Sequence, residues 1–272
     1  AEVRPYGELR GIGLRIAAEL RRRDLARGDR FAVMMRNQPE LVEAVAAASA
    51  TGTVFVPVDP RTRADKLAFM LADAGCRGLI CADHSLAEVA EAWASSPGLE
   101  WVLALETGEE LDAPALDDVD GVESLRAVLD GPVPSLGGAP ARGEDPLQIS
   151  YTSGTTGDPK GVVGSNARFV LAGMTWLLFG YQPDERPYTG LSMAHNNAWA
   201  VTLMPSLFLG LRAVMSRRFT KSRLWEVVRR YDCTTLSLVG GMATAIYSDP
   251  ARPDDADNPV RTVVSGGMPA AI

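Results

Sequence analysis

The segment that decides the fold is LQISYTSGTTGDPKG, residues 147–161. Its first part, 147–152, is predicted to form a buried strand. The part that follows, 152–161, combines three glycines and several hydroxyl side chains with Lys160. Glycine lets backbone N–H groups approach an anion closely, hydroxyls add donors, and a lysine supplies a compact positive charge. Because open α/β sheets bind ligands just beyond the carboxyl ends of their strands, the segment predicts a phosphate-binding loop.

Two residues distinguish this loop from the loop of P-loop NTPases. Gly161 stands where that motif has Ser or Thr after the lysine, and Pro159 stands where it has a glycine. Pro159 also cannot donate an N–H group to a phosphate. The kinase and GTPase interpretations are therefore disfavoured. The plain alternative is a Ser/Thr/Gly turn with a solvated lysine, and the length of the whole string argues against it. Arginine greatly outnumbers lysine in this chain, so a lysine in a glycine-rich loop stands out.

Working outward, helical patterns alternate with short β-branched runs along the chain, which is typical of parallel sheets covered by helices. We predict an α/β protein of two doubly wound, mainly parallel sheets flanked by helices. The segment 131–146 gathers Pro, Gly and charged residues without an apolar period, which places the boundary between lobes 1–143 and 144–272 there; a long surface loop is the alternative. The second lobe would carry the phosphate loop, followed by a helix from about Ser165 to Phe179.

Composition limits the partners of the chain. Its 272 residues are 46% hydrophobic, enough for one large core or two ordinary ones. The formal net charge of -7 gives no overall attraction to nucleic acid. No apolar stretch approaches the roughly 20 residues that span a bilayer, and no signal peptide opens the chain. The three scattered cysteines fit no disulfide framework or metal site. We expect a cytoplasmic protein that binds neither nucleic acid nor membranes.

The string 152–161 resembles the signature phosphate loop of the adenylate-forming superfamily, which includes acyl-CoA synthetases, peptide-synthetase adenylation domains and luciferases. Weaker matches lie in the order that the family has them, so the resemblance covers nearly the whole chain. They are Tyr6-Gly7-Glu8-Leu9, Gly28-Asp29-Arg30, Asn37, Gly52, Val56-Pro57-Val58-Asp59-Pro60, Met193-Ala194-His195-Asn196 and Val264-Ser265-Gly266-Gly267-Met268-Pro269.

The resemblance implies an enzyme that joins a small to medium carboxylic acid to ATP, with Mg²⁺, and transfers the acyl group of the adenylate to coenzyme A. It implies that Lys160, His195 and Thr155 are catalytic and that Thr156 holds the metal. It assigns the phosphates to the loop and the adenine side to a second glycine-rich segment. These cofactor-binding residues are Thr152, Ser153, Gly154, Thr155, Thr156, Gly157 and Lys160, with Gly266, Gly267, Met268 and Pro269 on the adenine side.

The resemblance also implies which residues border the acid. The candidates are His195, Asn196, Trp199, Gly241 and Met242. Each has a plainer interpretation. A loop histidine can simply be hydrogen-bonded, an aromatic residue on an apolar helix face is often core, and glycines after a strand can relieve crowding in a tight turn. For His84, the other histidine, the structural interpretation is preferred.

Several motifs of the family are not found before Ile272, namely Tyr-Gly-x-Thr-Glu, the ribose-binding Asp, the hinge and the carboxy-terminal domain. We therefore expect little or no adenylation by this chain alone. Two alternatives stay open, a carrier-protein thiol as acceptor and a non-catalytic nucleotide-binding module. A Rossmann oxidoreductase is disfavoured because no Gly-x-Gly-x-x-Gly follows a strand. The protein is expected to be a monomer or a homodimer.

Overall fold

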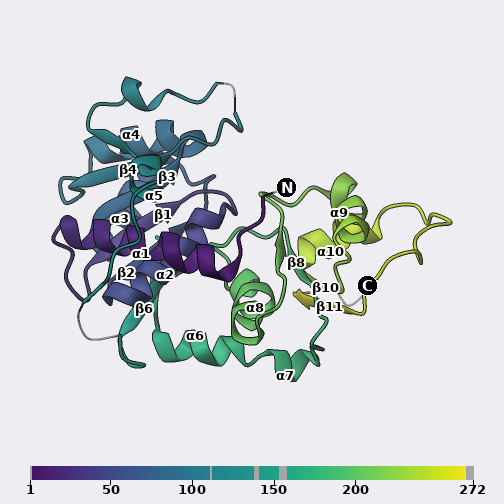
Figure 1. The fold of residues 1–272 in the computed structure, drawn as a ribbon. Coiled ribbons are helices and arrows are strands. Elements are labelled where there is room, and N and C mark those ends of the chain that lie inside the picture. The colour runs from purple at the N-terminus through teal and green to yellow at the C-terminus, as the bar shows by residue number, and fades with distance from the viewer. Residues whose placement is uncertain (1, 111, 138–140, 153–157, 268–272) are drawn as a thin grey trace. The chain divides into compact units, whose positions relative to one another are not determined.

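The computed structural model describes residues 2–110, 112–137, 141–152 and 158–267 (Figure 1). The chain forms two compact units that divide after Ala167. Each unit is built around its own sheet, of seven strands in the first and four in the second. The α/β class with mainly parallel sheets, predicted from the sequence, is confirmed.

The first unit is a sheet with strand order β5-β4-β3-β1-β2-β6-β7. All neighbours pair in parallel except β6 and β7, which are antiparallel. The strands are β1 (Arg30–Met34), β2 (Val54–Val58), β3 (Cys76–Ala82), β4 (Trp101–Leu105), β5 (Val122–Ser124), β6 (Pro146–Thr152) and β7 (Lys160–Ser165). The helices are α1 (Tyr6–Arg22), α2 (Pro39–Thr51), α3 (Ala64–Ala74), α4 (Leu86–Ala94) and α5 (Leu125–Leu129).

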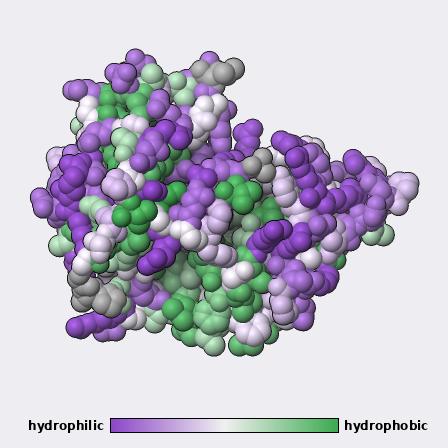
Figure 2. All heavy atoms as spheres, in the orientation of Figure 1, coloured by the Kyte–Doolittle hydropathy of each residue, from purple (hydrophilic) through white to green (hydrophobic). Residues whose placement is uncertain are grey.

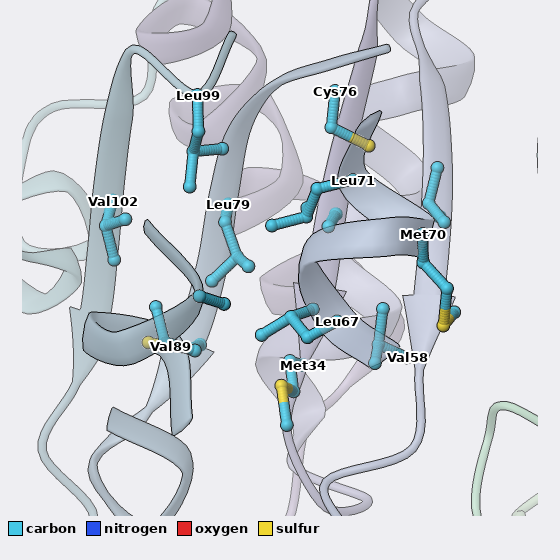
Figure 3. Close-up of a cluster of buried hydrophobic side chains, with 14 of the residues drawn as sticks. Met34, Val58, Leu67, Met70, Leu71, Cys76, Leu79, Val89, Leu99 and Val102 are labelled. Carbon is cyan, nitrogen blue, oxygen red and sulfur yellow. The ribbon is translucent and has the colours of Figure 1, made fainter. Parts of the chain in front are cut away.

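Local signals set the limits of these helices. Pro39 is at the first position of α2, where its missing N–H costs nothing, and Gly52 ends the helix in the left-handed conformation with φ of 76°. Gly75 ends α3 in the same way. Apolar residues of α3 and α4, such as Leu67 and Val89, pack against alternate residues of the strands in one buried cluster (Figure 3). This packing fixes α3 on the sheet.

One buried carboxyl group gives the first unit a dependence on pH. Glu43 of α2 is fully buried, and its Oε1 accepts a hydrogen bond of 3.3 Å from Nε of Arg4. Burial, and then repulsion from Glu40, raise the pKa of Glu43 to about 8, although Arg4 acts in the opposite direction. In the unfolded chain the carboxyl has its ordinary pKa of 4.5. The folded state therefore binds the proton more tightly.

We expect the free energy of unfolding to fall as pH rises from about 4.5 to about 8 and then to level off, because the unfolded chain loses the Glu43 proton first. Glu43→Gln should remove this loss and stabilise the protein by about 1–2 kcal/mol at pH 8, with little effect near pH 4.5. Urea denaturation near pH 4.5 and at pH 8 measures the difference in free energy of unfolding between Glu43→Gln and the unchanged protein. The exposed Glu91→Gln on α4 is the control, and a Glu43→Gln effect independent of pH would contradict the prediction.

The second unit is a parallel sheet with strand order β11-β10-β8-β9. Its strands are β8 (Pro187–Thr189), β9 (Val214–Met215), β10 (Thr235–Val239) and β11 (Thr262–Gly266). Its helices are α6 (Asn166–Gly173), which begins at the division, α7 (Trp176–Phe179), α8 (Met204–Leu209), α9 (Leu224–Arg230) and α10 (Gly240–Tyr247). A π-helical segment, Ala198–Leu203, leads into α8.

The structure differs from the sequence prediction in where the units divide. The predicted boundary at 143/144 assigned the phosphate loop to the second lobe, but β6 and β7 belong to the sheet of the first unit, which ends at Ala167. The Pro- and Gly-rich segment before β6 is the long connection that the sequence left as the alternative. It leads the chain to a new strand of the same sheet, beside β2.

Two local predictions after the loop were wrong in detail. Residues 160–165 form β7, where a turn entering a helix had been expected. Val162 and Val163 favour extended backbone, and an antiparallel return along β6 satisfies the ladder hydrogen bonds. The single predicted helix over 165–179 is divided into α6 and α7, and the Thr175 hydroxyl donates to the Ala172 carbonyl at 2.8 Å at the break.

Exposed apolar side chains of α6, α7 and α8 gather on one face of the second unit (Figure 2). They are Val170, Leu171, Met174, Leu177, Leu178, Leu207 and Phe208. Helices α6 and α8 are in contact, because a Cβ at Gly173 would lie 3.1 Å from Phe208. These helices are short, and nowhere in the described parts of the chain does a helix have the length and apolarity to cross a membrane.

Candidate functional site

The glycine-rich segment lies between the two strands of a hairpin. Thr152, the last residue of β6, is paired with Lys160, the first residue of β7. The pairing holds the two ends of the segment side by side. Ser153, Gly154, Thr155, Thr156 and Gly157 lie outside the described residues, so their predicted roles toward phosphate and metal remain predictions. Asp158, Pro159 and Lys160 are described, and the Lys160 side chain is exposed.

Helix α3 supports this hairpin. The hydroxyl of Tyr151 donates to Oδ2 of Asp73 at 2.6 Å and lies 3.3 Å from the carbonyl of Met70. Burial, and then the Asp73 carboxylate, raise the pKa of Tyr151 far above its ordinary value, so the hydroxyl keeps the proton that it donates. A Cβ at Gly161 would approach the Tyr151 ring to 3.4 Å. The strand next to the loop is thus fixed to α3 by a contact that the sequence analysis missed.

Lys160 carries a positive charge that no described residue neutralises. Its side chain forms no ion pair and no hydrogen bond within the described ranges 2–110, 112–137, 141–152 and 158–267. An exposed cation at the end of a glycine-rich segment fits a polyphosphate, whose oxygens need both positive charge and N–H donors. Over those same ranges, no three His, Cys, Asp or Glu side chains come together as metal ligands.

In the second unit the carboxyl ends of three parallel strands meet at one edge of the sheet. Ser237 of β10 is paired with Thr189 of β8, and Val239 of β10 is paired with Gly266 of β11. The loop 190–197, the turn at Gly240 and the end of β11 therefore follow the strands at the same edge. This is where open α/β sheets bind ligands. Most predicted acid-side and adenine-side positions are brought to this edge, while Met268 and Pro269 lie outside the described residues.

The loop after β8 presents the predicted histidine. His195 and Asn196 are exposed. The His195 N–H donates to the Ser192 carbonyl at 2.9 Å, so the backbone around it is a closed turn. The amide of Asn197 donates to the Leu238 carbonyl at 2.9 Å and lies 3.2 Å from the Ser237 hydroxyl. Asn197 fastens the loop to β10, and its neighbour His195 is left with its ring at the surface.

Two residues predicted to border the acid, Trp199 and Met242, are buried. Trp199 is 3% exposed, its indole N–H donates to the Met193 carbonyl at 2.5 Å, and its ring packs edge-on against Phe169 with 5.6 Å between centroids. Met242 is 8% exposed. The direction of an apolar side chain depends on tertiary packing, and for Trp199 the alternative of a core aromatic residue was weighed in advance, whereas for Met242 it was not. Gly241 is exposed and has no atom near the position of a Cβ.

The glycine that the turn requires is Gly240. A Cβ there would lie 2.1 Å from the carbonyl oxygen of Gly267, which is backbone and cannot rotate away. The turn after β10 and the end of β11 approach each other this closely only because position 240 has no side chain. Gly267 itself has φ of 71°, a conformation that glycine adopts without strain.

We expect Gly240→Ala to lower the free energy of unfolding of the second unit by about 1–3 kcal/mol, because the Gly267 carbonyl must move. Gly241→Ala is the matched control. It lies in the same helix with nothing within 4 Å of the new Cβ and should be neutral or stabilising by up to about 1 kcal/mol. Thermal denaturation compares the two variants. Equal effects of both substitutions would show that the close approach to Gly267 is unimportant.

His84 has the structural role that the sequence favoured. Its side chain is buried, and its Nε2 accepts a hydrogen bond of 3.3 Å from the Arg36 N–H. Burial, and then the Arg36 charge, lower its pKa. Its neighbour Asp83, which the sequence analysis missed, accepts from the N–H groups of Thr107 and Gly108 at 2.6 and 2.9 Å. These bonds outweigh burial and lower the Asp83 pKa, so this carboxylate anchors the loop after β4.

Comparison with known proteins gives one family. Residues 5–272 match the family described as AMP-binding enzyme. Over 95% of its length the chain is 32% identical to the medium/long-chain-fatty-acid–CoA ligase FadD17 of Mycobacterium marinum, of which it covers 48%. It is 27% identical to the long-chain fatty acid transport protein 1 of Rattus norvegicus over 91% of the chain and 38% of that protein.

Solved structures agree with these matches. The N-terminal domain of FACL13 from Mycobacterium tuberculosis superposes with a TM-score of 0.78 at 25% identity, covering 98% of this chain and 64% of that one. Acetoacetyl-CoA synthetase from Streptomyces lividans has a TM-score of 0.81 at 23% identity, over 97% of this chain and 42% of that one, and shows the shared fold. The chain spans about half the length of the curated relative FadD17.

Proposed function

The chain belongs to the family of AMP-binding enzymes, and from that premise we propose that it takes part in the ATP-dependent activation of a carboxylic acid to an acyl adenylate, with transfer of the acyl group to coenzyme A. The observation that carries the proposal is the hairpin of β6 and β7, which holds the ends of the signature loop together beside Lys160, whose side-chain charge no described residue neutralises.

The chemistry requires positive charge at the loop. A carboxylate oxygen attacks the α-phosphorus of ATP, the new acyl–phosphate bond forms, and the bond to the β-phosphate breaks with release of pyrophosphate. Both reactants are anions, so their repulsion must be offset. In this proposal Lys160 and the N–H and hydroxyl donors of 152–157 bind the β- and γ-phosphates and stabilise the charge of the leaving pyrophosphate. Bound Mg²⁺ would supply further positive charge, with Thr156 as its proposed ligand.

The acid is proposed to lie at the sheet edge of the second unit, where His195 and Asn196 are exposed. His195 would donate a hydrogen bond to the carboxylate of the acid. Trp199 and Met242, which are buried, are retained as proposed residues around the acid. FadD17 and FadD6, two of the curated relatives, are named as ligases of medium- and long-chain fatty acids, which favours a fatty acid over the small to medium acid expected from the sequence.

The acceptor is proposed to be coenzyme A, because FadD17 and FadD6 are named as CoA ligases. A carrier-protein thiol is the alternative acceptor. A non-catalytic nucleotide-binding module is the alternative from another class. An exposed and unneutralised Lys160 speaks against that module, which would have no pyrophosphate to stabilise. We propose a cytoplasmic setting, in which the three buried cysteines stay as free thiols.

ATP–pyrophosphate exchange tests the proposal. The assay uses a protein that contains this chain in full, with fatty acids of increasing length, short organic acids and aromatic acids. Thioester formation is then measured with coenzyme A as the acceptor and, separately, with a carrier protein as the acceptor. We expect exchange that depends on one class of acid and that is lost in the Lys160→Ala variant. ATP binding without exchange for any acid would favour the non-catalytic module. The 272-residue chain alone is expected to bind ATP with little or no exchange.

A further inference from the structure

A second lysine lies beside the two residues that immediately precede Lys160. Lys66, in the first turn of α3, lines a surface hollow together with Phe69 of the same helix and with Asp158 and Pro159. Asp158 and Pro159 are the two residues that precede Lys160 along the chain. The hollow therefore adjoins the segment that carries the loop lysine. The sequence analysis did not single out Lys66, because a lysine at the start of an ordinary amphipathic helix has no local signature.

The use of lysine in this chain is selective. Of the 27 basic residues only three are lysines, at positions 66, 160 and 221. Lys221 forms an ion pair with Asp249 at 2.6 Å. Lys66 and Lys160 form neither an ion pair nor a hydrogen bond with any residue that the structure describes. No described residue neutralises the charges of Lys66 and Lys160, so both charges are available to a bound ligand.

The geometry between α3 and the loop is fixed by the protein itself. Tyr151, next to the loop on β6, donates to Asp73 at the other end of α3. Leu67 and Leu71 of α3 are buried in the core of the unit, at 0% and 3% exposure. Lys66, on the exposed side of a helix that cannot shift, is therefore held at a constant position relative to the hairpin. A long, strongly hydrated lysine side chain can reach from such a position to an anion without moving the backbone.

The charges around the hollow limit what it can bind. Asp65 and Asp158 line the hollow with Lys66, and both carboxylates oppose an anion. The acidic residues make the hollow a poor site for a free anion in bulk solution. They leave Lys66 able to act only on an anion that the loop already holds. Asp158 should weaken phosphate binding, opposite to the effect of Lys66, and this difference in sign can be tested.

We infer that Lys66 is a second cation for the polyphosphate bound at the loop, contacting the β- and γ-phosphates of ATP or the released pyrophosphate from the α3 side. This inference rests on the proposed function of the loop. Lys66 acts there as a binding residue for the leaving group, whereas Lys160 acts from the end of the loop itself. A monophosphate lacks the part of the ligand that Lys66 would contact.

Isothermal titration of the 272-residue chain with ATP, pyrophosphate and AMP tests this inference. Lys66→Ala is expected to raise the Kd for ATP and pyrophosphate by about five- to tenfold and to leave the Kd for AMP unchanged. Lys66→Arg should restore most of the affinity, and Asp158→Asn should lower the Kd for pyrophosphate. Lys221→Ala is the matched control, because it removes the remaining lysine away from the loop. Circular dichroism checks that each variant is folded.

The outcomes separate this inference from the function on which it rests. If Lys160→Ala weakens pyrophosphate binding and Lys66→Ala does not, the loop binds phosphate and Lys66 is a solvated surface lysine. An equal loss of ATP and AMP binding in Lys66→Ala would also overturn the inference, since it would indicate a general effect on the unit. If the unchanged chain binds neither ATP nor pyrophosphate, the proposed function of the loop fails together with the inference.

Discussion

Lys160→Ala is expected to weaken ATP binding by about 10- to 100-fold. The residue stands at the first position of β7, paired with Thr152 at the other end of the loop, and no described residue neutralises its charge. A charge held at this point can approach the β- and γ-phosphates directly. Its removal leaves the N–H and hydroxyl donors but no fixed cation from the loop. Isothermal titration of the 272-residue chain with ATP measures the loss.

Three comparisons make this result specific. Lys160→Arg should retain part of the affinity, since charge is kept while its shape changes. Lys221→Ala, which breaks only the ion pair with Asp249, should bind ATP as the unchanged chain does. Raising the salt concentration should weaken ATP binding to the unchanged chain more than to Lys160→Ala. An undiminished affinity in Lys160→Ala would mean that the loop binds no phosphate.

The second large effect is expected in the core of the first unit, at Gly78. This residue lies in β3 directly opposite Trp101 of β4. A Cβ at position 78 would lie 1.9 Å from Cζ2 of the Trp101 ring, which is 5% exposed and covered by the Arg23 guanidinium at 4.9 Å from its centroid. The ring has no space to move. We expect Gly78→Ala to lower the free energy of unfolding by about 3 kcal/mol or more.

Urea denaturation of the Gly78→Ala variant measures this loss. Gly98→Ala is its control, because Gly98 is exposed with nothing within 4 Å of a new Cβ. The double variant Gly78→Ala with Trp101→Leu should regain part of the loss caused by the first substitution, since the smaller side chain leaves room for the new methyl group. A single variant as stable as the unchanged protein would show that the two strands can separate at low cost.

Much of the fold could be predicted because its signals are local. Pro39 and Gly52 mark the two ends of α2, and Gly75 marks the end of α3, each through backbone conformation alone. Strand β7 could not be predicted in this way. Its sequence KGVVGS contains two glycines, and the chain forms a strand there because the open edge of β6 is available to pair with. The predicted boundary between the units differs from the observed division for a related reason. A turn-rich segment does not show which sheet the next strand joins.

The residues of the candidate site likewise fall into those that could be predicted from the sequence and those that could not. The loop residues from Thr152 to Lys160 could be predicted because their chemistry is contained in one contiguous string. The positions of Trp199 and Met242 depend on helix orientation, which residue type does not determine. The support of the loop by Tyr151 and Asp73 joins residues 78 positions apart, and neither residue type announces such a contact. Lys66 was missed for the same reason, because its significance comes from its neighbours in space.

The pairing of Thr152 with Lys160 has a consequence for entropy. Bringing the ends of a free seven-residue segment, 153–159, together restricts the chain, and in this protein folding has already imposed that restriction. Association with a ligand then need not include the cost of closing the segment. Substitutions that separate β7 from β6 should therefore weaken ligand affinity through an unfavourable binding entropy, even where every residue that touches the ligand is unchanged.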